Sequence, residues 1–111
     1  MLEASDIYAD INSYPPLRRQ EIANTYIGKE VDWLLTFSNG SEEQDEAHLI
    51  FRSEPHQIRM ITGTVALSDY PWLRSLASDE RVRVRGRIRR VDELITKLDI
   101  LELALPEPAK V

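Results

Sequence analysis

The sequence predicts a mostly β protein, a small barrel of five strands with added helices. Residues 81–91 alternate arginine with apolar residues at a period of two, which suits a half-buried strand and would scatter arginine around a helix. Four other stretches, residues 29–38, 47–52, 58–67 and 95–103, also indicate strands. A chain of 111 residues, 42% of them hydrophobic, suffices for one domain with one modest core.

The first predicted element is a helix at about residues 15–26, which follows an N-terminal extension of residues 1–14. Pro15 and Pro16 suit a helix start, because the first helical turn does not use their missing N–H groups. Gly28 is a stop signal for this helix.

The first strand, residues 29–38, has an apolar inner face made of Val31, Trp33, Leu35 and Phe37. Leu34 falls on its outer face. Asn39 and Gly40 predict a turn, and the acidic residues 41–46 continue it as a loop without apolar side chains.

The next elements complete the barrel. The second strand, residues 47–52, leaves Ile50 on its outer face, and Gly63 predicts a bulge or a bend in the third. Residues 68–71 indicate the start of a short helix between the third and fourth strands. The alternation of the last strand breaks near Ile100 and Leu101, where we expect a bulge.

The fourth strand carries the most distinctive pattern of the chain. Its inner residues are Val82, Val84, Gly86 and Ile88, and its outer residues are Arg81, Arg83, Arg85, Arg87 and Arg89. We call these five arginines the arginine stripe. They could follow a phosphate backbone in salt-dependent binding. Alternatively, they pair across strands with Glu30, Asp32 and Asp99, which would neutralise much of the stripe.

Two stretches resemble the tRNA-anti-like OB-fold family: residues 26–31, where a helix runs into a strand, and residues 73–88, a helix, a turn and the arginine strand. The resemblance covers residues 15–104 and leaves 105–111 as a C-terminal tail. It implies a five-stranded OB-fold-like Greek-key barrel that works as a binding module. OB-folds bind single-stranded nucleic acids, oligosaccharides and proteins, so the ligand stays open.

Composition limits the classes of function. The net charge of −5 and the pI near 5.0 disfavour a dedicated nucleic-acid binder, although six of the 14 lysines and arginines lie within residues 81–90. Cysteine is absent, which excludes disulfides and thiolate metal sites. No apolar run could cross a membrane and no secretory signal is present, so we expect a soluble, cytoplasmic protein unless the chain is a domain of a larger one.

Catalytic signals are missing. His48 and His56 have no nucleophile at a recognisable spacing, and no glycine-rich phosphate loop or hydrolase motif occurs. The acidic residues 42–46 do not follow a calcium-loop pattern. We therefore predict a protein that is not an enzyme and that uses no metal or cofactor.

Two functional hypotheses remain. The first, which we favour, is a protein-interaction or sensory module, with Leu34 and Ile50 forming a small exposed apolar patch. The second is weak, salt-sensitive binding of single-stranded nucleic acid by the arginine stripe, with Tyr70 as a candidate exposed ring. A continuous positive groove on the folded barrel would favour the second hypothesis, and a neutralised stripe the first.

Overall fold

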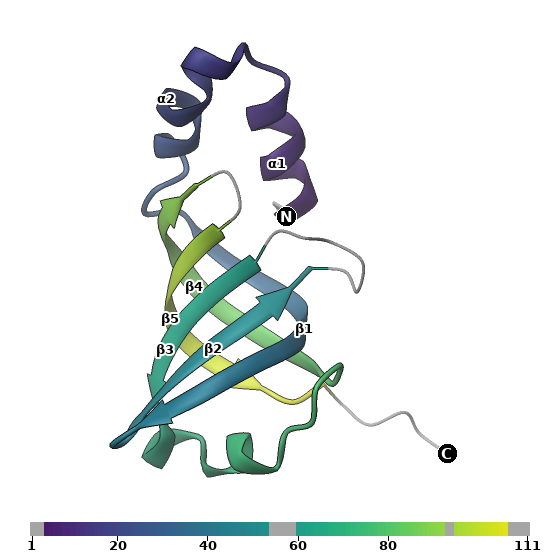
Figure 1. Cartoon of the computed structure of the whole chain (residues 1–111), viewed down its shortest axis with the longest axis vertical. Helices are drawn as coiled ribbons and strands as arrows, with labels where there is room; N and C mark the ends of the chain where they lie inside the picture. Colours follow the sequence, from purple (N-terminus) through teal and green to yellow (C-terminus); the bar gives the residue numbers. More distant parts are fainter. Residues whose placement is uncertain (1–3, 54–59, 93–94, 107–111) are drawn as a thin grey trace.

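The computed structural model describes residues 4–53, 60–92 and 95–106, and Figure 1 shows a β-barrel with helices at one end and short helical turns at the other. The strands are β1 (Glu30–Glu43), β2 (Glu46–Arg52), β3 (Met60–Ala66), β4 (Arg81–Val91) and β5 (Ile95–Ala104). They close in the order β1-β2-β3-β5-β4, with β3 and β5 parallel and the other pairs antiparallel. The predicted OB-fold-like barrel is confirmed.

The inner faces of β1 and β4 form the centre of the core. Val82 and Val84 are 0% exposed, and Trp33 and Phe37 are buried as predicted. Full burial of such side chains stabilises the fold by about 1.5–3 kcal/mol each, which fixes the phase of both strands. The arginines of β4 consequently point outward.

The β1–β2 hairpin corrects the prediction of an acidic loop. β1 does not turn at Asn39 but passes a bulge at Ser38 and continues to Glu43, and the chain reverses only at Gln44 and Asp45. Gln44 takes the positive φ of 55° that this tight turn requires. Residues 39–43 of β1 are exposed on both faces, so this part of the strand needs no apolar side chains.

Two helices cover one end of the barrel. The predicted helix at 15–26 consists of a 3₁₀ turn, η1 (Pro16–Arg18), and α2 (Arg19–Asn24). Before it, the predicted extension contains a helix, α1 (Ala4–Asn12), which the sequence analysis did not anticipate. No helix in the described ranges is long and apolar enough to cross a membrane.

The short helix predicted between the third and fourth strands is present as two 3₁₀ turns, η2 (Leu67–Asp69) and η3 (Pro71–Ser75). Pro71 opens the second turn, where its missing N–H is not needed. Leu67 and Leu73 are buried and close the other end of the barrel.

Bulges shape β4 and β5. The register between them shifts at Leu101, which confirms the bulge predicted near Ile100 and Leu101. A second shift occurs at Arg89, which was not predicted. The β2–β3 register passes through Gly63 without a shift, so this residue forms no bulge in that pairing.

Candidate functional site

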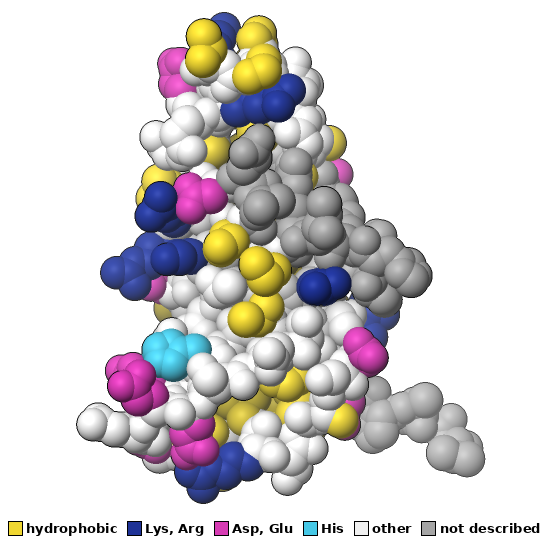
Figure 2. All heavy atoms as spheres, in the orientation of Figure 1, with side chains coloured by type: hydrophobic (Ala, Val, Ile, Leu, Met, Phe, Trp, Pro, Cys, Tyr) yellow, Lys and Arg dark blue, Asp and Glu magenta, His cyan; other side chains and the backbone are white. Residues whose placement is uncertain are grey.

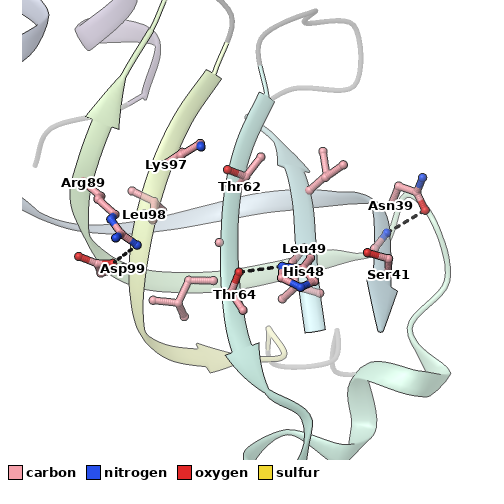
Figure 3. Close-up of a pocket in the computed structure, with 14 residues that line it drawn as sticks. Asn39, Ser41, His48, Leu49, Thr62, Thr64, Arg89, Lys97, Leu98 and Asp99 are labelled. Atoms are coloured by element: carbon pink, nitrogen blue, oxygen red, sulfur yellow. Dashed lines mark hydrogen bonds and ion pairs between the residues drawn. The ribbon is translucent and has the colours of Figure 1, made fainter. Parts of the chain in front are cut away.

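A groove of about 560 Å³ lies over the barrel wall formed by β2, β3 and β5, as Figure 3 shows. Its floor is apolar and is formed by Leu49, Leu98 and Ile100. Its rim is mainly polar and includes Asn39, Ser41, His48, Thr62, Thr64, Arg89, Lys97 and Asp99. An apolar floor within a polar rim is the usual composition of a binding site.

The groove exists because β3 and β5 separate. Their parallel pairing runs from Met60 and Ile95 as far as Gly63 and Leu98. Beyond this point β3 pairs only with β2, and β5 only with β4. The side chain of Ile100 reaches across the opening to Gly63, where it occupies the space that a Cβ atom would need.

The rim is held by a few local contacts. His48 Nδ1 lies 3.1 Å from Thr64 Oγ1, and the guanidinium of Arg89 lies 3.7 Å from the carboxylate of Asp99. The bulge in β4 places Arg89 at the rim, since a bulge redirects a side chain. Lys97 has no ion-pair partner in the part of the chain that the structure describes. Figure 2 shows hydrophobic side chains in the middle of this face, with histidine, lysine and arginine side chains around them.

The arginine stripe is largely paired with carboxylates. Arg83 donates to both oxygens of Asp32, at 3.0 and 3.3 Å. Arg85 donates to Glu30 at 3.1 Å and to Glu102 at 3.4 Å, and the hydrogen bond to Glu30 is the main reason that the pKa of Arg85 is raised. These exposed pairs add little stability. They do cancel much of the positive charge.

Two arginines of the stripe are exceptions. Arg81 and Arg87 form no ion pair with any residue in the described ranges. All three predicted acids take part in the pairing, and Glu102 joins them as a partner that the sequence analysis missed. The bulge at Leu101 reverses the phase of β5, which turns Glu102 toward Arg85 and exposes Leu101.

The other predicted site residues lie apart. Leu34 is 39% exposed and lies opposite Arg83, whereas Ile50 lies opposite Asn39 and Thr62 in the groove. The two therefore do not form one apolar patch. Tyr70 is half-buried at the η2–η3 end of the barrel, where its ring packs edge-on against Trp72 at 6.1 Å.

Among the residues that the structure describes, no aromatic side chain lines the groove. Trp33, Phe37 and Phe51 are all buried in the core, and Phe51 is 0% exposed. Single-stranded nucleic acids bind OB barrels largely by stacking bases on exposed rings. The groove does not offer that contact.

The described residues also contain no group of three or more histidine, aspartate or glutamate side chains that could hold a metal ion. Nδ1 of His48 contacts the Thr64 hydroxyl, and its Nε2 lies 3.9 Å from the carboxylate of Glu46. His56 lies outside the described residues.

Solved structures share the architecture of this chain at low sequence identity. A lipoprotein from Klebsiella pneumoniae, named for a proposed nucleic-acid binding, is 12% identical with a TM-score of 0.63, and the match covers 90% of this chain and 89% of that one. An OBody, AM1L10, bound to hen egg-white lysozyme is 10% identical with a TM-score of 0.61, over 81% and 90% of the two chains. The fold is an OB-fold.

A third similar structure is asparaginyl-tRNA synthetase from Pyrococcus horikoshii, at 12% identity and a TM-score of 0.61. The match covers 94% of this chain and 21% of the synthetase, so the OB-fold described here spans about a fifth of that enzyme. A synthetase from Leishmania major is matched over 18% of its length. No family model and no curated protein matches the chain, and the likeness to the tRNA-anti-like group therefore rests on the motifs alone.

Proposed function

We propose that this protein is a non-enzymatic interaction module that binds a partner protein through the groove over β2, β3 and β5. It serves a protein-interaction or sensory role as one domain of a larger protein or assembly. The observation that supports this best is the groove itself, because an apolar floor without an exposed aromatic ring suits aliphatic protein side chains better than nucleobases.

The charge distribution supports the same proposal. A phosphate backbone approaching the stripe would have to replace the carboxylates that already hold Arg83 and Arg85. The net charge of −5 opposes the approach of a polyanion from other directions. A protein surface with mixed charges meets no such barrier.

The alternative function is single-stranded nucleic-acid binding through the strand at residues 81–90. Arg81 and Arg87 favour it, since neither has an ion-pair partner within the described chain. Because only these two arginines of the stripe are available for phosphate contacts in the described part of the chain, we expect nucleic-acid binding to be weak and salt-sensitive.

A peptide selection tests the proposal. A random peptide library is selected on the wild-type chain, and the enriched peptides are measured against Thr64→Tyr, which fills the rim of the groove. Ser75→Tyr is the matched control, because Ser75 is exposed and outside the groove. We expect peptides that bind the wild type and the control but lose about tenfold or more with Thr64→Tyr.

A selection that yields no groove-dependent peptide contradicts the proposal. Tight binding of labelled single-stranded oligonucleotides at physiological salt, lost in a folded Arg83→Glu/Arg85→Glu variant, would replace it with the alternative.

A further inference from the structure

We infer that the groove takes its partner as an extended strand, which forms backbone hydrogen bonds with the open edges of β3 and β5. This inference rests on the proposed function and adds the mode of binding and the chemistry of the bound segment. Three observations carry it: the end of the β3–β5 pairing, the shared direction of the two strands, and the charge at one end of the opening.

The first observation is the unpaired edges. From Thr64 to Ala66, β3 pairs with β2 on one side only, and from Asp99 to Ala104, β5 pairs with β4 on one side only. Elsewhere in the described chain these edges find no other backbone hydrogen-bond partner. An open edge presents a row of N–H and C=O groups, which an extended peptide can complete.

The second observation is direction. Because β3 and β5 run parallel, a strand that is antiparallel to one of them is antiparallel to the other as well. Antiparallel pairing is slightly more stable per residue than parallel pairing. The bound segment therefore runs opposite to β3, with its C-terminal end near Gly63 and its N-terminal end near Ala66.

The third observation is the chemistry along this path. Alternate side chains of the segment face the apolar floor, where Leu49 and Leu98 are each 4% exposed and Ile100 is half-buried. Ile100 must shift to admit such a side chain. At the Gly63 end Lys97 lines the rim without an ion-pair partner among the described residues. The segment consequently alternates aliphatic and polar residues and carries a carboxylate near its C-terminal end.

Backbone methylation of the groove-dependent peptides from the selection above tests the strand pairing. Each backbone N–H is replaced in turn by N–CH₃, which removes one donor and leaves the side chains in place. Neighbouring N–H groups of an extended segment point alternately to β3 and to β5, so we expect methylation at each consecutive position in the middle of the segment to weaken binding about tenfold. Methylation at positions beyond the paired stretch should have a much smaller effect, and an effect at alternate positions only would mean that the segment pairs with just one of the two edges. Uniform tolerance of methylation would overturn the strand mode while the proposed function stands. A lack of groove-dependent peptides would overturn both.

A charge exchange tests the direction of the segment. Lys97→Glu should weaken binding of peptides that carry an acidic residue near the C-terminal end, and replacing that residue with lysine should restore it. Arg81→Glu is the matched control, since Arg81 is exposed, lies outside the groove and forms no ion pair in the described ranges. Rescue by a lysine at the N-terminal end instead would overturn the antiparallel assignment.

Discussion

At the scale of single residues, two glycines determine how closely the strands of the barrel approach. A Cβ atom on Gly63 would lie 2.3 Å from Cδ1 of Ile100, whereas one on Gly86 would lie 2.8 Å from the backbone oxygen of Asp99. A side chain can move away from a new methyl group more easily than a paired strand can. An alanine should therefore be tolerated better at Gly63 than at Gly86.

This difference gives the first prediction. Gly86→Ala should destabilise the fold by about 1–3 kcal/mol, because the backbone of β5 cannot yield, and Gly63→Ala should cost less. Urea unfolding of both variants measures the two free energies. Combining Gly63→Ala with Ile100→Ala should remove the clash, and equal costs for the two single variants would contradict the packing described here.

The phase of the arginine strand gives the second prediction. Val84 is 0% exposed, so Val84→Asp places an unpaired carboxylate in the core at a cost of several kcal/mol and should abolish cooperative unfolding. Thermal melts followed by circular dichroism measure this. Arg81→Asp, three residues earlier on the outer face, is the control and should melt nearly as the wild type does. A Val84→Asp variant with a wild-type melt would show that the strand phase is wrong.

At the scale of elements, α1 is part of the barrel core rather than a loose extension. Ile7, Tyr8 and Ile11 are buried in the same cluster as the barrel residues, and Tyr8 Oη lies 2.7 Å from Thr96 Oγ1. Sequence reasoning missed this helix because it is only nine residues long and its apolar residues appear scattered among Asp6 and Asp10. The apolar side chains of α1 can be recognised as one face only once the helix is packed against the end of the barrel.

The third prediction compares two aliphatic truncations. Ile7→Ala should lower the free energy of unfolding by about 2–4 kcal/mol, since Ile7 is 1% exposed and its removal leaves a cavity. Leu17→Ala, at a residue that is 100% exposed, should change it by less than about 0.5 kcal/mol. Similar losses in the two variants would mean that α1 does not belong to the core.

The contact between the helices gives the fourth prediction. Tyr26 donates to Asp10 Oδ2 at 2.5 Å, and burial together with this hydrogen bond raises the pKa of Tyr26 from 10.0 to about 12. A raised pKa in the folded state means that stability present below the unfolded pKa is lost as the pH rises through about 10 to 12. Tyr26→Phe should have a lower free energy of unfolding than the wild type at neutral pH. Its free energy of unfolding should, however, fall less as the pH rises from about 10 to 12. Parallel alkaline profiles for the two proteins would contradict this.

At the scale of the whole molecule, the sequence predicts what depends on local alternation and misses what depends on register. Residues 81–91 could be assigned to a strand with the correct phase because arginine and apolar side chains alternate there. The groove could not be predicted, because it depends on the parallel pairing ending at Gly63 and Leu98, a contact between distant segments. Glu102 was missed as a partner of Arg85 because the bulge was predicted near Ile100 and Leu101 without an exact position, and that position decides which face of β5 Glu102 takes.

Charge pairing over the barrel leads to the last prediction, which concerns oligonucleotide affinity. Three acids hold Arg83 and Arg85, so Glu30→Gln/Asp32→Asn/Glu102→Gln should free both arginines without changing the shape of the surface. We expect the wild type to bind labelled single-stranded DNA weakly at low salt, and we expect this affinity to fall as salt is added. The triple variant should bind about tenfold more tightly at low salt and show a steeper salt dependence, because each freed arginine adds a phosphate contact.

Fluorescence anisotropy at several salt concentrations measures the affinity and its salt dependence. A second triple variant distinguishes the effect of freeing the arginines from the effect of a less negative net charge. Glu21→Gln/Glu43→Gln/Asp69→Asn removes the same number of negative charges at exposed residues away from the stripe. If this control gains as much affinity as the first variant, long-range charge rather than the pairing of Arg83 and Arg85 limits binding. If the wild type already binds as tightly as the first triple variant, the carboxylates do not limit oligonucleotide binding, and the ion pairs of Arg83 and Arg85 do not shield the stripe.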